Sequence, residues 1–243
     1  MAVLSEPLLK LTDKSLPDTG QIQEKLLMKT KENKIPEATI KRLSTYINCL
    51  ERLQVEKHPV ISSEMLGEYC QVSPAQIRKD LSYFGEFGVR GVGYDTKKLE
   101  AEIKEILGLN YNWPTTVVGV GKLGLALLNF ALFRRHGFSI TAAFDSDPAK
   151  IGTGLAGGIT IQPISEIEET VSSRGILIGV ITTPAEAAQG VADQLVAGGI
   201  QGLLNFAPTK VKVPDEITLR NVSITSELDN LAYLMTQKKK SRR

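Results

Sequence analysis

A glycine-rich turn between residues 119 and 124 is the part of this sequence best suited to bind a charged ligand. It has the pattern GxGxxG and lies between an apolar run, 115–120, and a segment with helical periodicity that begins at Lys122. In this pattern the first glycine permits a tight turn, the second lets a pyrophosphate approach the backbone, and the third allows close packing of helix on strand. The helix N-terminus adds N–H donors that face the phosphates. The turn predicts a dinucleotide site formed by Gly119, Val120, Gly121, Lys122, Leu123 and Gly124.

Asp145 makes the glycine turn more specific for one class of dinucleotide. It follows a second apolar run, 139–144, and lies 21 residues after Gly124. A carboxylate at the end of the second strand hydrogen-bonds the ribose 2′-OH and repels a 2′-phosphate. We therefore expect NAD(H) rather than NADP(H) as the ligand. The alternative is a glycine turn that binds nothing.

The residues that a dehydrogenase needs beside the nicotinamide are missing from the second half of the sequence. That proton donor or acceptor is usually a histidine or a Tyr/Lys pair. Of the two histidines, His58 falls in the first half and His136 at the end of the helix expected after the glycine turn. No Tyr-x-x-x-Lys pattern follows the turn, and the region is too short for a separate substrate domain. We predict a domain that binds a dinucleotide without using it chemically, and no catalytic residues, so the protein is not expected to be an enzyme.

The two cysteines, Cys49 and Cys70, have neither the spacing of zinc ligands nor the number of a disulfide framework. Cysteines in short amphipathic helices are usually buried, so we expect core residues, with a thiol switch as the alternative. No metal site is expected.

Strands and helices alternate from residue 115 onward. Strands separated by helices predict a parallel, doubly wound α/β sheet, which is the Rossmann arrangement. Capping boxes are expected at Ser165 and Thr183, before the second and third helices. The expected strands are 115–120, 139–144, 175–181, 200–205 and 217–222, and the expected helices include 122–135, 185–197 and 227–237.

A short helix with a strong N-terminal signal lies in the first half. Ser73 fits the N-cap, Pro74 the first helical position and Gln76 the third, which is a capping box, and the helix stops at Gly85. Helices before it, a glycine-rich wing after it and one more helix predict a winged helix-turn-helix, which binds double-stranded DNA. These neighbours are expected at 36–53, 62–69, 85–94 and 97–107, the last capped by Asp95 and Thr96.

Charge is distributed unevenly, although the net charge is only +2. Six Lys/Arg against two Glu lie between Lys25 and Arg42, whereas residues 111–237 hold eight Lys/Arg against eleven Asp/Glu. A basic end and an acidic body suit a protein that touches phosphates with one part only, and solvated tails are the alternative. No apolar run approaches the roughly 20 residues that span a bilayer, and the first residues lack the pattern of a secretory signal. We expect a cytoplasmic protein without a membrane partner.

Periodicity and composition divide the 243 residues into four regions. The first has little periodic pattern and contains Pro7, Pro17 and Gly20, so we expect a mobile arm. The expected regions are a flexible N-terminal arm, 1–34, a winged-helix DNA-binding domain, 35–110, a Rossmann NAD(H)-binding domain, 111–224, and a C-terminal helix with a basic tail, 225–243.

Three stretches of the sequence resemble the Rex family of NAD(H)-sensing redox transcriptional repressors, and the match covers roughly residues 35 to 234. The most specific is 76–94, QIRKDLSYFGEFGVRGVGY, and the others are FDSDPAKIG at 144–152 and LNFAP at 204–208. The resemblance implies a repressor that binds palindromic operator DNA as a homodimer and is released when NADH occupies its Rossmann domain. It also implies that the C-terminal helix is exchanged into the partner, between the partner's two domains.

The resemblance also assigns site residues by position. Contacts to DNA are expected from Ser73, Gln76, Arg78, Lys79, Ser82, Tyr83 and the wing residue Arg90. Besides the glycine turn, contacts to NAD(H) are expected from Asp145, Asp147, Lys150, Thr182, Asn205, Phe206, Ala207 and Pro208.

The sequence departs from the family pattern at three positions near the nicotinamide and the domain interface. Phe130 stands where members tend to have tyrosine, Ser223 where they tend to have aspartate, and Asn48 where some have arginine. The resemblance implies that in the family these polar groups link the redox state of the cofactor to DNA binding. Their replacement bears on how sharply the protein separates NADH from NAD⁺.

Two other functions fit parts of the sequence. An NAD-dependent oxidoreductase with a fused regulatory domain would turn over a small alcohol or hydroxy acid. A scaffold or CoA-binding module would bind CoA and not NADH, since some CoA-binding proteins share this topology.

Overall fold

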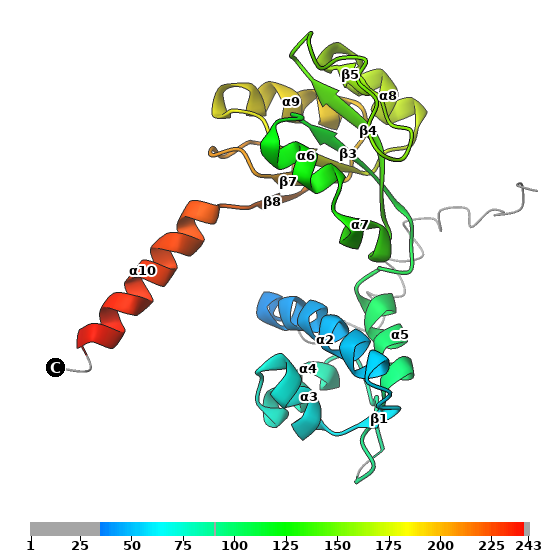
Figure 1. Cartoon of the computed structure of the whole chain (residues 1–243), viewed down its shortest axis with the longest axis vertical. Coiled ribbons are helices and arrows are strands. Elements are labelled where there is room, and N and C mark those ends of the chain that lie inside the picture. The colour runs from blue at the N-terminus through cyan, green and yellow to red at the C-terminus, as the bar shows by residue number, and fades with distance from the viewer. Residues whose placement is uncertain (1–34, 90, 241–243) are drawn as a thin grey trace, which may run out of the picture. The chain divides into compact units, whose positions relative to one another are not determined.

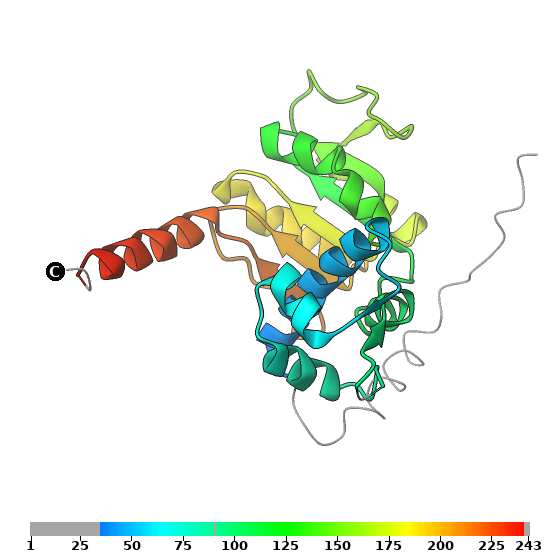
Figure 2. The same cartoon turned by 60° about the horizontal axis from the view of Figure 1, so that its bottom comes forward.

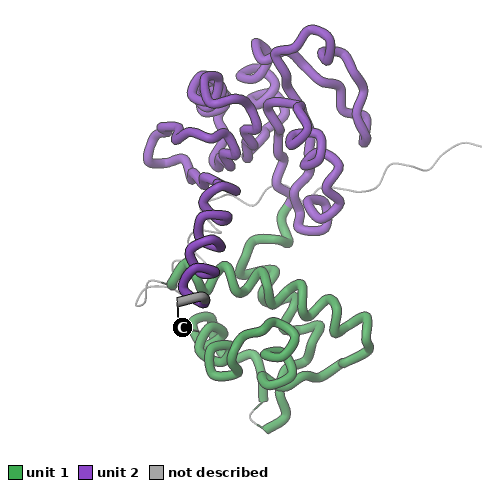
Figure 3. The backbone as a smooth tube through the Cα atoms, turned by 60° about the vertical axis from the view of Figure 1, so that its left-hand side comes forward, with its two compact units in different colours: residues 1–111 green, residues 112–243 purple. Residues whose placement is uncertain are grey.

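The computed structural model describes residues 35–89 and 91–240 of the chain. They fall into two compact units, and the boundary between the units in the sequence lies between Tyr111 and Asn112 (Figure 3). The expected N-terminal arm, 1–34, the wing residue Arg90 and the last three residues of the basic tail lie outside the described residues.

The first unit is the predicted winged helix-turn-helix (Figure 1). Its helices are α2 (Glu37–Val55), α3 (Ser63–Cys70), α4 (Pro74–Ser82) and α5 (Thr96–Ile106), and β1 (Val60–Ile61) pairs antiparallel with β2 (Tyr94–Asp95). Both cysteines belong to its core, as expected, and burial raises the pKa of the Cys70 thiol. The core also contains Leu43, Tyr46, Ile47, Leu50, Leu66, Ile77, Leu81, Leu99 and Ile103.

The helix starts of this unit follow the caps that the sequence predicts, with one correction. The hydroxyl of Ser73 accepts the N–H of Gln76 at 3.3 Å, and Asp95 accepts that of Lys98 at 2.8 Å. The Gln76 side chain, however, does not close the capping box. Its amide nitrogen donates to Asp80 Oδ1 at 2.8 Å, and this bond to a buried carboxylate one turn later turns the side chain away from the Ser73 N–H.

The wing is smaller than the predicted pair of short strands. It holds one antiparallel bridge, between Val89 and Gly93, and the chain then enters β2. Gly93 has φ +108°, and a Cβ on it would lie 2.3 Å from the carbonyl oxygen of Ile61. The close approach of the wing to β1 therefore requires glycine at this position.

The second unit is built on a parallel six-stranded sheet with the order β5-β4-β3-β6-β7-β8. The chain starts in the middle of the sheet, builds outward in one direction, and returns to build in the other. This is the doubly wound arrangement that the sequence predicts. Its strands are β3 (Trp113–Val118), β4 (Phe138–Asp145), β5 (Ile161–Pro163), β6 (Ile178–Ile181), β7 (Gly202–Asn205) and β8 (Thr218–Asn221).

Helices cover both faces of this sheet, α6 on the side opposite to α8 and α9 (Figures 1 and 2). Helices α8 (Ile167–Ser173) and α9 (Ala185–Ala197) pack against Val118, Phe144 and Ile181. On the other face, Leu128 of α6 (Lys122–Leu128) packs against a small cluster around Ala143. Successive residues of β4 thus point to opposite faces, as a strand in a sheet covered on both sides requires.

Three details of the second unit differ from the prediction. The helix expected at 122–135 is broken into α6 and α7 (Ala131–Arg135). The side-chain amide of Asn129 donates to the carbonyl oxygen of Leu125 at 2.9 Å, and the backbone of Phe130 is extended, so the helix ends before Phe130. Strand β5 was not expected, since it has three residues and one is proline. The capping boxes at Ser165 and Thr183 are wrong, because a 3₁₀ turn, η1 (Ile164–Glu166), precedes α8 and Pro184 caps α9 without a side-chain bond.

The C-terminal helix α10 (Ile224–Lys240) is longer than predicted, and every side chain described on it is exposed. Its apolar residues include Leu228, Leu231 and Met235, which are 60%, 53% and 55% exposed. No helix among residues 35–89 and 91–240 is long and apolar enough to cross a membrane.

Candidate functional site

The glycine turn joins the end of β3 to the start of α6, and each of its three glycines has a different environment. Gly119 has φ +97°, and its Cβ would lie 2.9 Å from the carbonyl carbon of Thr182. A Cβ on Gly124 would lie 2.0 Å from the carbonyl oxygen of Gly119. Around Gly121, in contrast, no atom of the described chain beyond its immediate neighbours in sequence lies within 4 Å of that position. Two glycines thus serve packing, and Gly121 leaves an open space beside the backbone where a ligand can approach.

Asp145 ties the end of β4 to this turn. Its Oδ2 accepts the N–H of Val120 at 2.8 Å and the ammonium of Lys150 at 3.0 Å, and its Oδ1 accepts the N–H of Asp147 at 2.9 Å. Burial raises the pKa of Asp145, but these donors outweigh it and leave the pKa below its ordinary value. An ionised carboxylate therefore lies next to the open side of the glycine turn, where a ribose is expected.

The loop after β7 is held by Asn205, which is fully buried. Its Nδ2 donates to the carbonyl of Thr209 at 2.7 Å and to Asn221 Oδ1 at 2.9 Å, while its Oδ1 accepts the N–H of Ala207 at 3.0 Å. Every polar atom of this amide is thus bonded, within the loop or to β8. Asn205 therefore shapes the loop. Because the N–H of Phe206 donates to the carbonyl of Ile181, it is the side chains of Phe206 and Pro208 that remain to meet a ligand.

Two threonines follow β6 beside the glycine turn. Thr182 Oγ1 donates to the carbonyl oxygen of Gly119, 2.6 Å away, so it fixes the turn from within. Thr183 Oγ1 is buried, and no hydrogen-bond partner lies within reach of it in the described chain. A buried hydroxyl without a partner is rare in native proteins, and Thr141 on β4 is the other case in the described chain. Thr183 differs in lying beside the glycine turn, where its hydroxyl can meet a polar group of a ligand. The sequence assigned Thr183 to a helix cap, so its place in the site was missed.

These features together fit a dinucleotide. The carboxyl ends of β3, β4, β6 and β7 lie at one edge of the sheet, at the point where the strand order reverses. The open space at Gly121, the α6 N-terminus, the anionic Asp145 and the orphan hydroxyl of Thr183 meet there. The predicted residues of the glycine turn, Asp145, Asp147, Lys150, Thr182 and the 205–208 loop are thus all brought to that edge.

The second candidate site is α4 with its surroundings. Its buried residues are Ile77, Asp80 and Leu81, while Arg78 and Lys79 are exposed. Ser73 and Ser82 are exposed at its two ends, and Tyr83 is half-buried just after it. Of the residues expected on DNA, these five lie on or at the ends of one helix. Gln76 differs, because its amide turns inward to Asp80.

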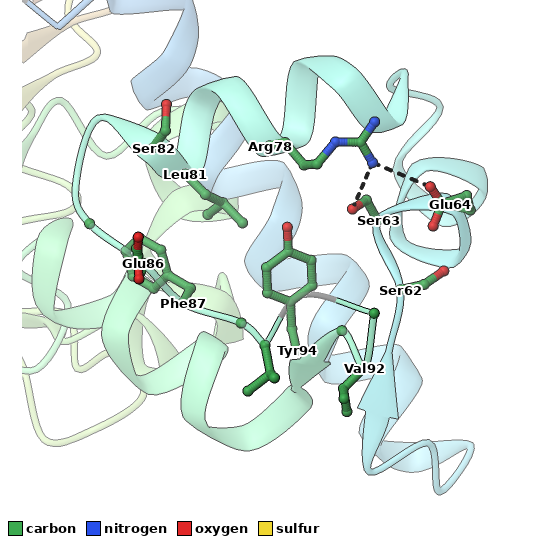
Figure 4. Close-up of a pocket in the computed structure, with 15 residues that line it drawn as sticks. Ser62, Ser63, Glu64, Arg78, Leu81, Ser82, Glu86, Phe87, Val92 and Tyr94 are labelled. Carbon is green, nitrogen blue, oxygen red and sulfur yellow. Dashed lines mark hydrogen bonds and ion pairs between the residues drawn. The ribbon is translucent and has the colours of Figure 1, made fainter.

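A hollow of about 710 Å³ opens between α4, the start of α3 and the wing (Figure 4). Arg78 lies at its rim, where its Nη1 donates to Ser63 Oγ at 3.1 Å and to Glu64 Oε1 at 3.3 Å. Leu81, Phe87 and Tyr94 are among its apolar residues. No local pattern predicts the contact between Arg78 and Glu64, because the two residues are 14 positions apart.

Under α4 lies a buried polar cluster around Asp80 that was not predicted from the sequence. Asp80 is fully buried and accepts hydrogen bonds from Thr39, Arg42, Tyr46 and Gln76. Burial raises the pKa of Asp80, yet these four donors outweigh it and hold the pKa below its ordinary value. The helix that carries Arg78 is thereby anchored to α2 by a buried charge.

Known proteins match both halves of the chain. A family model described as "Putative DNA-binding protein N-terminus" matches residues 34–82, and one described as "CoA binding domain" matches residues 110–209. The redox-sensing transcriptional repressor Rex of Syntrophobacter fumaroxidans is 53% identical over 82% of this chain and 95% of its own length. That of Thermotoga petrophila is 48% identical over the same shares.

Solved structures agree in fold. The crystal structure of RSP in complex with β-NAD⁺ and operator DNA has a TM-score of 0.80 and 33% identity, and covers 87% of this chain and 97% of that one. The structure of RSP with β-NADH has a TM-score of 0.77 and 32% identity, over 87% of this chain and 99% of that one.

Proposed function

The chain belongs to the Rex family of redox-sensing transcriptional repressors, and from this premise we propose that NADH at the glycine turn releases α4 from a palindromic operator. It is a DNA-binding repressor regulated by NAD(H), and a regulator rather than an enzyme. One observation carries the proposal: the same chain holds an exposed, capped, basic helix and an open glycine turn joined to an anionic Asp145. We place this activity in the cytoplasm, where operator DNA and NAD(H) meet.

For DNA, α4 is the element that enters the major groove. Arg78, at its middle, and Lys79, in its last turn, are exposed, while Ile77 and Leu81 hold it on the core. In helix-turn-helix proteins the second helix contacts base edges with its N-terminal residues. We assign base contacts to Arg78 and phosphate contacts to Lys79, Ser73 and Ser82. Gln76 contributes indirectly, by fixing α4 on Asp80.

For the dinucleotide, the residues of this chain divide the work of binding. The N–H groups at the start of α6 and the open space at Gly121 receive the pyrophosphate. Asp145 accepts a ribose hydroxyl while Lys150 and the N–H of Val120 hold its carboxylate in place. Thr183 and the 205–208 loop lie at the carboxyl ends of β6 and β7, and we assign them to the nicotinamide end of the cofactor. When bound, NADH and NAD⁺ differ in a hydride and in the positive charge of the nicotinamide, and this difference is the signal.

The repressor works as a homodimer in this proposal. A helix with an exposed row of Leu228, Leu231 and Met235 is unusual for a monomer, and such faces are normally buried against a partner. A second copy of the chain offers the same helix in return, as two-fold symmetry demands. We therefore propose that α10 is exchanged between subunits. Two copies of α4 would then read the two halves of a palindrome.

A binding competition tests the proposal. A labelled operator duplex, selected from a randomised library with the wild-type protein, is followed by fluorescence anisotropy while NADH is added. We expect NADH to raise the dissociation constant of the operator, NAD⁺ to leave it nearly unchanged, and NADPH to act only at far higher concentration. An operator affinity that stays constant at saturating NADH, with binding verified by calorimetry, contradicts the proposal.

The match to a CoA-binding model names a second ligand worth an arm of the same experiment. In calorimetry with the full-length protein, we expect heat of binding from NADH and none from CoA. Binding of CoA without binding of NADH would identify a CoA-binding module and exclude the redox-sensing mechanism.

A further inference from the structure

Arg78 of α4 is tied to the first turn of α3. Its Nη1 donates to both Ser63 Oγ and Glu64 Oε1, although its side chain is 55% exposed and that of Glu64 is 64% exposed (Figure 4). Two exposed side chains with many rotamers gain little stability from such a pair. The contact therefore calls for a reason other than folding.

The contact with Ser63 and Glu64 uses the Nη1 side of the guanidinium and leaves the Nε–Nη2 side available for another acceptor. Hydrogen bonds that Arg78 makes within the described chain involve Nη1 alone, so the edge formed by Nε and Nη2 points away from Ser63 and Glu64. A pair of parallel N–H donors is what binds O6 and N7 of guanine in the major groove. An arginine held at one end also loses less side-chain entropy when it binds.

Glu64 is an anion beside a surface that must approach phosphates. It lies in the first turn of α3, and its own backbone N–H and the Ser62 hydroxyl lower the pKa of its carboxyl. A negative charge here weakens the attraction of any DNA backbone, whatever its sequence. The presence of Glu64 is explained if this residue increases the preference for the operator sequence by more than it lowers the affinity for DNA of any sequence.

We propose that Glu64, assisted by Ser63, is a positioning residue that sets the base selectivity of Arg78. Hydrogen bonds from Nη1 hold the guanidinium so that its free edge meets a guanine and cannot swing to a neighbouring phosphate. This inference rests on the proposed function, because it requires α4 to lie in the major groove. It adds that the selectivity of the recognition helix is controlled from α3.

The test compares the base preferences of full-length variants on a randomised duplex library. Arg78→Ala first identifies the operator position whose guanine preference depends on Arg78, with an expected loss on the order of tenfold. Glu64→Ala should lower the preference at that same position at least about threefold and leave other positions unchanged, since one tether of Arg78 is lost. Glu64→Gln keeps an acceptor oxygen without the charge, so it should retain most of the preference.

Two further variants complete the comparison. Ser63→Ala removes the second tether and should relax the same position less than Glu64→Ala. Glu68→Ala removes an equal charge from another exposed position of α3, and should leave all base preferences as in the wild type. Thermal unfolding and NADH affinity, measured for each variant, should stay close to the wild type. The side chains of Glu64, Glu68 and Arg78 are exposed, and the buried Ser63 loses only its hydroxyl.

The outcomes distinguish a failure of the proposed base contact by Arg78 from a failure of the positioning role of Glu64. If Arg78→Ala changes no base preference, the placement of Arg78 in the proposed function is wrong. If Arg78→Ala does and Glu64→Ala does not, the positioning role is wrong. Equal losses of preference in Glu64→Gln and Glu64→Ala would show that Glu64 acts through its charge alone and would overturn the tether. A uniform gain of affinity for all sequences in both variants, with no loss of preference at the Arg78 position, would overturn it as well.

Discussion

Arg42 of α2 and Asp80 of α4 form a two-point ion pair inside the DNA-binding unit. Arg42 Nε lies 2.6 Å from Asp80 Oδ2, and Nη2 lies 2.7 Å from Oδ1. Asp80 is fully buried, whereas 28% of the Arg42 side chain is exposed. The hydroxyl of Tyr46 donates to the same carboxylate at 2.7 Å. Since a paired geometry of this kind restricts both orientation and distance, the angle of α4 on α2 is determined here as well as by the apolar core.

Replacing Asp80 by alanine should destabilise the first unit by about 3 kcal/mol, because the donors of Arg42 and Tyr46 lose their acceptor. Partial exposure of Arg42 keeps the effect at the lower end of the range for broken buried pairs. Urea denaturation followed by circular dichroism measures it. As a control, Glu102→Gln removes an exposed pair with Lys98 on α5 and should change stability by less than about 0.5 kcal/mol. Equal midpoints for the Asp80 variant and the wild type would refute the role of the cluster.

Acid should weaken the first unit through the same carboxyl group. The pKa of Asp80 in the folded protein lies below its ordinary value, so the folded state binds the proton less readily than the unfolded chain. The stabilisation is therefore complete above about pH 4, the range of an unfolded aspartate, and is lost as the pH falls toward the folded pKa. Urea midpoints between pH 6 and pH 2.5 should fall more steeply for the wild type than for Asp80→Asn, which has no carboxyl to titrate. Parallel curves would assign the acid sensitivity to other groups.

Substitution by alanine should lower NADH affinity at Gly121 and protein stability at Gly124, although both glycines belong to the same turn. The methyl group of Gly121→Ala meets nothing within 4 Å in the described chain beyond its neighbours in sequence, so the protein should fold normally. It should bind NADH at least about tenfold more weakly, because the methyl group fills the space of the pyrophosphate. Gly124→Ala places its Cβ 2.0 Å from the carbonyl oxygen of Gly119, so it should destabilise the second unit itself. Calorimetry with NADH and thermal unfolding separate the two effects.

A third glycine serves as the control for this pair. Gly190 lies inside α9 with open space around its Cβ position, so Gly190→Ala should raise helix stability slightly and leave NADH affinity unchanged. If Gly121→Ala bound NADH like the wild type, the pyrophosphate would have to lie elsewhere.

The elements of both units were predictable because their local signals agree with their packing. The Ser73 and Asp95 caps, the stripe from Leu43 to Leu50 and the strand before Gly119 each belong to one short stretch of sequence. The predicted capping box at Thr183 was wrong because Pro184 can start a helix without a side-chain cap. That hydroxyl is left for the cofactor edge, and a local pattern has no information on what lies beside it in space.

The least predictable part of both sites was the set of partners that hold each functional residue. Asp80 meets α2 residues that precede it by 34 to 41 positions, and Arg78 meets Glu64 across a helix-helix turn. Such contacts depend on the angle between helices, which periodicity does not specify. The type of site was therefore clear from residue spacing, whereas its positioning residues required the structure.

Charged substitutions on α10 should dissociate the proposed dimer. Leu228→Asp with Leu231→Asp puts two carboxylates on the exposed apolar row, and should raise the dimer dissociation constant by about 100-fold or more. Folding of the single subunit should be unaffected, because both leucines are exposed in it. Light scattering across a dilution series measures the mass, and Asn230→Asp adds a charge on α10 away from the row as the control. A doubly substituted protein that stays dimeric would place the interface elsewhere.

Asp145→Asn should change the choice of cofactor as well as its affinity. Asparagine keeps an oxygen for the N–H of Val120 but no longer offers a charged acceptor to a ribose hydroxyl, so NADH should bind about tenfold more weakly. The change also removes a main partner of the Lys150 ammonium, which lies 3.0 Å from Asp145 but 3.8 Å from Asp147.

A freed cation at this place can meet a 2′-phosphate, and the anion that repelled it is gone. NADPH should therefore bind to Asp145→Asn more tightly than to the wild type, and the double variant Asp145→Asn/Lys150→Ala should lose that gain. Calorimetry of the wild type and both variants with each cofactor gives the six affinities, with Asp193→Asn on the exposed side of α9 as the control. If NADPH gains nothing in the single variant, Asp145 does not discriminate at the ribose, and the preference for NAD(H) must come from another residue of the site.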